Sequence, residues 1–173
     1  MCFTDIEKPD FVHYTDAEKV NFAYFIAERA HSGQFDKAGK PYIEHPVRVC
    51  EKMRDNDCKI AALLHDTIED TFVTKELIDE LFGEVIGLAV DLLTRKEGES
   101  YMEFINRMCL TGFNGISSWK ERSYKIARLV KITDLEDNMN LGRLSEVTEE
   151  DLNRVKKYEK ARKRLLEVQP KIK

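Results

Sequence analysis

The stretch ALLHDTIEDT, residues 62–71, contains the side chains whose types and spacing best suit chemistry. On one helix, His65 and Glu69 would lie four residues apart, as would Asp66 and Asp70, so we expect neighbouring members to share a face. Three carboxylates crowded beside an apolar run would cost roughly several kcal/mol each unless a positive charge offset them. A divalent cation would be a compact source of that charge. Imidazole and carboxylate ligands together favour manganese, iron or zinc over calcium.

Two adjacent ligands do not complete a metal site, so further candidates are needed. His45, in the sequence YIEHP, and Asp134, in LVKITDLEDN, are polar residues beside or within apolar runs. Taken singly, a histidine before a proline is usually a helix cap or a surface residue, and a lone helical aspartate is usually solvated. Beside the pair His65 and Asp66, both gain weight as metal ligands.

The elements that must position these side chains are expected to be helices throughout. A capping-box pattern at Thr15 precedes apolar residues at helical spacing, and Thr148 with three acids after it opens the last helix. The segment HSGQFDKAGKPYI, residues 31–43, has two glycines and a proline and predicts an ordered surface loop. Other helices are expected from Pro46, from residue 59 through the acids of the opening stretch, and over 74–83, 83–93, 100–110 and 120–141. The sequence therefore predicts an all-α bundle around one centre.

Length and composition fit one globular domain spanning residues 1–173. With 42% hydrophobic residues the chain can bury one substantial core. A net charge of −4 gives no overall attraction to nucleic acid, and the basic end of the last helix is expected to be a solvated face, with RNA contact as the less favoured alternative. The four cysteines show no CxxC spacing, and no apolar segment is long enough to cross a membrane. We therefore expect a cytoplasmic protein with reduced thiols.

Three motifs in this order carry a resemblance to a known family: HSGQFDKAGKPYIEHPVRV, AALLHDTIEDT and ARLVKITDLEDN. Over residues 15–141 the chain resembles the metal-dependent HD-domain hydrolases of the RelA/SpoT homologue family, which remove the 3′-pyrophosphate of the alarmone (p)ppGpp. The resemblance implies a single-domain HD-type helical bundle with a metal site at its centre. It also implies a stand-alone small alarmone hydrolase, because only about thirty residues follow and no synthetase domain is expected.

Carried over residue by residue, the resemblance implies roles for eight side chains. They are the metal ligands His45, His65, Asp66 and Asp134, the acids assisting the attacking water, Glu69 and Asp70, and the nucleotide contacts Lys37 and Asn138. The expected cofactor is one divalent metal ion, Mn²⁺, which would lower the pKa of a water ligand from about 15.7 toward neutrality. Glu69 could then orient that water and take its proton. The expected partner is a small phosphorylated nucleotide.

Two places depart from the family pattern and bear on the substrate. The loop has Asp36 before Lys37 where active members tend to carry a basic pair, and residues 135–137 are Leu-Glu-Asp where an Arg-Leu-His run is usual. Each replacement removes attraction for a polyphosphate, and an acid in its place adds repulsion. Another nucleotide substrate, such as NADPH or a pyrophosphorylated RNA end, therefore stays open. So does a non-catalytic module that senses a nucleotide or binds a protein.

Overall fold

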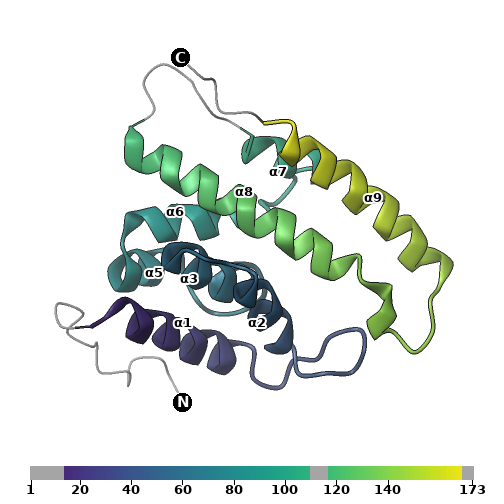
Figure 1. The fold of residues 1–173 in the computed structure, drawn as a ribbon, viewed down its shortest axis with the longest axis horizontal. Helices are drawn as coiled ribbons and strands as arrows, with labels where there is room; N and C mark the ends of the chain where they lie inside the picture. The colour runs from purple at the N-terminus through teal and green to yellow at the C-terminus, as the bar shows by residue number, and fades with distance from the viewer. Residues whose placement is uncertain (1–13, 110–116, 169–173) are drawn as a thin grey trace.

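The computed structural model describes residues 14–109 and 117–168, which form a helical bundle (Figure 1). The helices are α1 (Asp16–Ala30), α2 (Glu44–Glu51), α3 (Asn56–Leu64), α4 (Thr67–Asp70), α5 (Lys75–Phe82), α6 (Glu84–Leu93), α7 (Tyr101–Arg107), α8 (Ser118–Asn138), the 3-10 helix η3 (Leu141–Arg143) and α9 (Glu149–Leu166). Within the described ranges, β pairing is limited to an isolated bridge between Phe35 and Pro41. The predicted all-α fold is confirmed for this part of the chain.

The core lies where α3 meets its neighbours. Every residue of α3 from Ile60 to Leu64 is buried, which is typical of a helix with others on all sides. It packs against α1, α2, α6 and α8. In Figure 1, α8 runs across the middle of the molecule, with α9 along one side and α1 to α3 on the other. The buried face of α8 includes Val130 and Asp134, so a polar residue reaches the core from this helix.

Local sequence signals set several helix ends as predicted. Thr15 and Glu18 form a reciprocal capping box, in which the Thr15 hydroxyl accepts from the Glu18 N–H at 3.3 Å. Thr148 and Asp151 do the same at the start of α9. Gly83 ends α5 and begins α6 with φ 87°, a conformation that a residue with a Cβ rarely adopts.

One expected helix in the opening stretch is wrong. The chain does not run as one helix through Asp70, because α3 ends at Leu64 and α4 begins at Thr67. Side chains bind carbonyl groups at the break: the Thr67 hydroxyl donates to the Leu64 carbonyl at 2.7 Å, and Nδ1 of His65 lies 2.8 Å from the Ala62 carbonyl oxygen. His65 and its successor therefore lie in a turn between two helices.

Other predicted boundaries shift by two or three residues. The helix expected from Pro46 begins at Glu44, which places the proline within the first turn, where its missing N–H has no intrahelical partner to lose. The helix expected to reach residue 141 ends at Asn138. There the Asn140 side chain accepts from the Gly142 N–H at 3.2 Å and starts η3.

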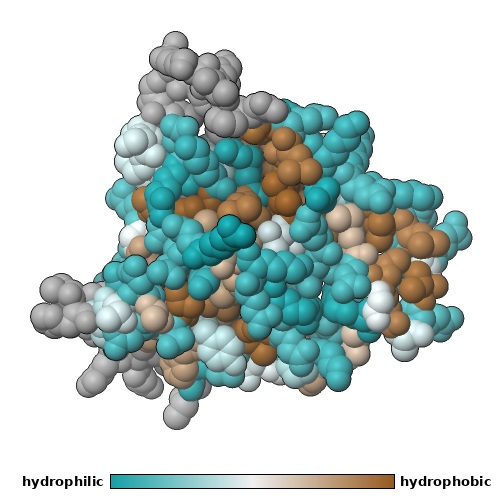
Figure 2. Space-filling model, viewed as in Figure 1, coloured by the Kyte–Doolittle hydropathy of each residue, from teal (hydrophilic) through white to brown (hydrophobic). Residues whose placement is uncertain are grey.

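The surface alternates between polar and apolar side chains. Figure 2 shows a face that is largely hydrophilic, with separate hydrophobic patches between charged groups. Phe35, at 67% exposure, is the most exposed of the large hydrophobic side chains that the structure describes. None of the helices described combines the length and apolar character needed to cross a bilayer.

Candidate active site

Three helices, two of them consecutive and the third distant in sequence, bring the four predicted metal ligands together. His45 comes from α2, His65 and Asp66 from the turn between α3 and α4, and Asp134 from α8. The three helices contact one another in every pairing. The side chains of His45, His65 and Asp134 are buried, and that of Asp66 is 22% exposed. We call these four side chains the His/Asp cluster.

The distances within the cluster suit a single cation. Nε2 of His45 lies 3.0 Å from Oδ1 of Asp134, and Nε2 of His65 lies 3.6 Å from the same oxygen. Oδ2 of Asp66 lies 3.0 Å from Nε2 of His65 and 3.8 Å from Nε2 of His45. One ligand atom from each of His45, His65 and Asp134 fits within 4.8 Å of the other two.

The outer nitrogen of each histidine fixes which nitrogen faces the cluster. Nδ1 of His65 is 2.8 Å from the Ala62 carbonyl oxygen, which can only accept, so Nδ1 carries the proton. Nδ1 of His45 is 2.8 Å from Oδ2 of Asp137, another acceptor. In the neutral rings both Nε2 lone pairs then face carboxylate oxygens. Such an arrangement is repulsive until a cation lies between them, and it is the one that metal-binding histidines use.

The electrostatics of the cluster also indicate a site for a cation. Burial disfavours the charged forms of Asp66 and Asp134. Even so, His65 holds the pKa of Asp66 well below the usual range, and Lys131 does the same for the pKa of Asp134. Burial also disfavours the charged form of His65, but the adjacent carboxylates raise its pKa to about 10. The cluster therefore attracts positive charge strongly, as protons or as a metal ion that replaces them.

Three residues that sequence reasoning did not select hold the ligands in place. The Tyr42 hydroxyl donates to Oδ2 of Asp66 at 2.5 Å, and the buried Lys131 ammonium donates to Oδ2 of Asp134 at 2.8 Å. Asp137 accepts at Oδ1 from Nε of Arg48 at 2.9 Å while its Oδ2 faces His45. A signal for Asp137 was present, because it follows Asp134 by three residues and so shares its helix face.

The two predicted catalytic acids lie on α4, immediately after the cluster. Both Glu69 and Asp70 are exposed. The Glu69 carboxylate accepts from the backbone N–H of Arg95 at 2.9 Å, and the Asp70 carbonyl accepts from the Gln34 amide at 3.2 Å. Neither carboxylate makes one of the cluster contacts described above. Their roles in water activation stay predictions.

A cleft of about 290 Å³ adjoins the cluster and contains both predicted nucleotide contacts. Its lining is made by Phe35, Asp36, Lys37, Tyr42, His45, Asn138, Asn140, Leu141, Arg143, Leu144, Arg154 and Tyr158. Three of these side chains are permanent cations and one is an acid, so the cleft favours anions although the chain is acidic overall. The Asn138 amide donates to Oδ1 of Asp134 at 2.6 Å, which joins the cleft to the cluster.

The acids that replace basic family residues do not present free negative charge in this cleft. Oδ1 of Asp36 accepts from the backbone N–H groups of Ala38 and Lys40 at 2.8 and 2.9 Å, and its Oδ2 lies 3.1 Å from NH1 of Arg143. Asp137 is paired with Arg48, as described above. Each carboxylate is already bound by an arginine, which reduces the repulsion expected for a polyphosphate, and the effect of these acids on the substrate stays a prediction.

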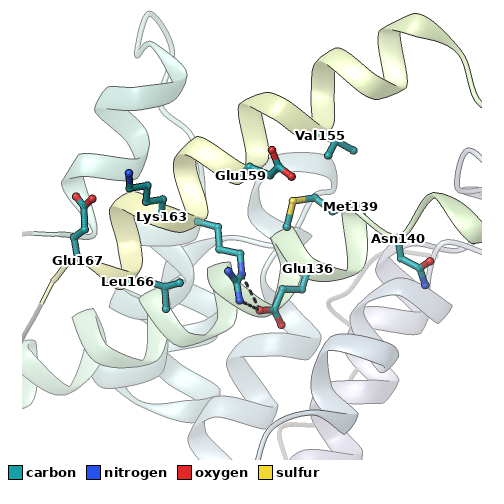
Figure 3. A pocket seen from close by; sticks show the side chains of 9 residues that line it. Glu136, Met139, Asn140, Val155, Glu159, Lys163, Leu166 and Glu167 are labelled. Carbon is teal, nitrogen blue, oxygen red and sulfur yellow. Dashed lines mark hydrogen bonds and ion pairs between the residues drawn. The ribbon is translucent and has the colours of Figure 1, made fainter.

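A larger hollow, of about 800 Å³, lies between α8 and α9 and is shown in Figure 3. Met139, Val155 and Leu166 contribute its apolar part. Across it, Arg162 forms an ion pair with Glu136 at 2.7 Å. None of the eight predicted site residues lines this hollow, so its size alone does not make it the reaction centre.

Comparison with known proteins identifies the domain. Residues 23–107, which include three of the four cluster residues, match the family model of the HD domain. The chain contains an HD domain. A solved structure described as a metazoan ortholog of SpoT that hydrolyzes ppGpp has the same fold, with a TM-score of 0.67 and 24% identity. That match covers 90% of this chain and 89% of the other.

Curated relatives of the HD domain come from several bacteria. The chain is 40% identical over 114 residues to the guanosine-3′,5′-bis(diphosphate) 3′-pyrophosphohydrolase of Aquifex aeolicus, which covers 58% of this chain and 16% of that protein. It is 37% identical over 131 residues to the Haemophilus influenzae protein of the same name, covering 69% and 18%. A Myxococcus xanthus GTP pyrophosphokinase is 39% identical over 84 residues, covering 46% and 11%. The chain thus spans less than a fifth of each of these relatives.

Proposed function

We propose that this HD domain is a metal-dependent phosphohydrolase that releases pyrophosphate from the 3′ position of (p)ppGpp. The observation that carries the proposal is the His/Asp cluster, with two imidazole nitrogens and two carboxylates, at the side of a cleft lined by three cationic side chains. Two curated relatives bear the name of this activity. A nucleotide with pyrophosphate groups matches both the charge of the cleft and the donor set beside it.

The proposed cofactor is Mn²⁺, held by His45, His65, Asp66 and Asp134. Mixed nitrogen and oxygen donors suit this ion, and the orientation of both Nε2 atoms supports the assignment. When bound, a divalent ion acidifies water and offsets the charge of a phosphate group. The hydrogen bonds from Tyr42 and from other neighbours keep the ligands in one arrangement, which lowers the cost of assembling the site.

The chain's own groups account for the remaining steps. Glu69 orients the attacking water and takes its proton, with Asp70 assisting, while Lys37 and Asn138 contact the nucleotide. Water adds to the phosphorus bonded to the 3′ oxygen, the bond to that oxygen breaks, and a proton ends on the new 3′ hydroxyl. From ppGpp the products are GDP and pyrophosphate.

The test is to incubate the Mn²⁺-loaded protein with ppGpp, NADPH and a 5′-triphosphorylated RNA, and to measure phosphate and pyrophosphate separately. We expect pyrophosphate and GDP in equal amounts from ppGpp. Phosphate release from NADPH alone, or cleavage of the RNA end alone, would replace the proposed substrate. Nucleotide binding without any product would leave a sensing module in place of an enzyme.

A further inference from the structure

We propose that Arg143 binds the non-reacting 5′-phosphate groups of the nucleotide, and that Asp36 and Asp137 hold its guanidinium for this task. The inference rests on the proposed function for the identity of the substrate. A nucleotide that is cleaved at its 3′-pyrophosphate presents a second charged group at its 5′ position. Arginine suits such a group because its planar guanidinium can donate two parallel hydrogen bonds to a phosphate.

Arg143 is anchored from two separate parts of the chain. It ends η3, its NH1 lies 3.1 Å from Oδ2 of Asp36 in the loop before α2, and its NH2 donates to the Asp137 carbonyl at 3.1 Å. A guanidinium has five N–H groups. Among the described residues, its buried Nε has no hydrogen-bond partner. The side chain is 25% exposed and lines the cleft, so it is fixed in place and still has donors to offer.

The position of Arg143 separates it from the reaction centre. It donates to the carbonyl of Asp137, and Oδ2 of Asp137 lies 2.8 Å from Nδ1 of His45. The other ring nitrogen of His45, Nε2, faces the cluster. Arg143 therefore reaches the cluster, at His45, only through one intervening residue, Asp137. A phosphate group bound by Arg143 is a different one from the group at the cluster, as a nucleotide with two charged ends requires.

The other cations of the cleft are less suited to set its specificity. Lys37 is 65% exposed and lies 3.7 Å from Oδ1 of Asp151, so its ammonium is loosely held. Arg154 pairs with the same carboxylate oxygen at 2.9 Å, within α9. Arg143 instead brings a positive charge to the loop position where Asp36 stands. Arg143, from η3, thus supplies the positive charge that position 36 of the loop lacks.

The test compares the affinities of GDP and guanosine by calorimetry with Mn²⁺ present, because GDP has the 5′-diphosphate and no 3′-pyrophosphate. We expect Arg143→Ala to weaken GDP binding by at least about 10-fold and to leave guanosine binding unchanged. Arg143→Lys should recover part of the loss. Arg122→Ala is the matched control, because Arg122 also bridges two aspartates, Asp55 and Asp57, but lies outside the cleft.

A second variant keeps the inference testable if Arg143→Ala does not fold. Asp36→Asn removes the ion pair that holds Arg143 and keeps a side-chain acceptor for the loop N–H groups, so GDP should bind roughly 2- to 5-fold more weakly. Unchanged GDP affinity in Arg143→Lys and Asp36→Asn, or a wild-type protein that binds GDP no better than guanosine, overturns the inference. Turnover of ppGpp by the wild type tests the proposed function separately.

Discussion

At the scale of single residues, the proposed metal site depends on how two histidine rings are held. Each ring directs Nδ1 to an acceptor outside the cluster, the Ala62 carbonyl for His65 and the Asp137 carboxylate for His45. Each ring therefore directs an unprotonated Nε2 inward when it is neutral. Because these contacts exist within the folded chain, little rearrangement is needed for the rings to bind a metal ion.

Removing one carboxylate should empty the metal site. Asp66→Ala takes away the oxygen 3.0 Å from Nε2 of His65. We expect the purified variant to lose bound metal and nearly all turnover, since metal affinity falls when a ligand is deleted. Metal analysis after gel filtration measures this, with Asp91→Ala, a surface aspartate paired with Lys96, as the control. Stoichiometric metal and full activity in Asp66→Ala would remove this residue from the site.

Glu69 should affect the rate without affecting metal content. In Glu69→Gln the side-chain oxygen can still accept from the Arg95 N–H, so the local structure should be kept, while the basicity is lost. We expect bound metal to stay and the maximal rate to fall about 10²- to 10⁴-fold. Steady-state kinetics measure it, and Glu97→Gln, in the same surface hollow, is the control that should keep its rate. Equal rates in both variants would give Glu69 a structural role.

At the scale of elements, the break between α3 and α4 positions the central pair of predicted ligands. A continuous helix would give the Leu64 carbonyl a backbone partner, whereas here it accepts from the buried Thr67 hydroxyl. The turn carries His65 and Asp66 where α2 and α8 converge. The side-chain hydrogen bond at the break therefore matters to the site as well as to the helix ends.

Replacing that hydroxyl should destabilise the fold. Thr67→Val keeps the shape of the side chain and leaves the buried Leu64 carbonyl without its donor, so the free energy of unfolding should fall by about 1–3 kcal/mol. Thr133→Val is the matched control: its hydroxyl donates to the Leu129 carbonyl inside the regular helix α8, where the backbone also provides a donor. Urea denaturation measures both. Equal losses in the two variants would contradict a special role for the break.

Sequence alone predicts the features of the fold that depend on residues close together in the chain. The capping box at Thr15 and the helix start at Thr148 depend on residues within four positions, and both form as expected. The break after Leu64 was not predicted, because the side-chain hydrogen bonds that hold it, from Thr67 to Leu64 and between His65 and Ala62, compete with a regular helix only where these groups are buried. The pairing of Asp36 with Arg143 joins positions 107 residues apart, so a residue that looked repulsive in the sequence is neutralised in the structure. The four cluster residues could be selected by type and motif, but their distances required the packing of three helices.

At the scale of the whole molecule, the cluster ties together distant parts of the chain. His45 and Asp134 are far apart in sequence, and only the packing of α2, α3 and α8 brings them to 3.0 Å. The buried carboxylates among them are costly unless positive charge is present. The folded chain therefore offers a cation a preformed site that the unfolded chain lacks.

A cation that binds only the folded state should raise the stability of the entire domain. At a free concentration about 100 times its dissociation constant, one ion adds about 2.7 kcal/mol to the free energy of unfolding. We expect Mn²⁺ to raise the melting temperature in proportion to the logarithm of its concentration, and Ca²⁺, which prefers all-oxygen sites, to do so much less. Asp66→Ala should show no such rise. Thermal denaturation across a metal titration measures this without any substrate, so an equal rise in wild type and variant would place the ion elsewhere, whatever the reaction proves to be.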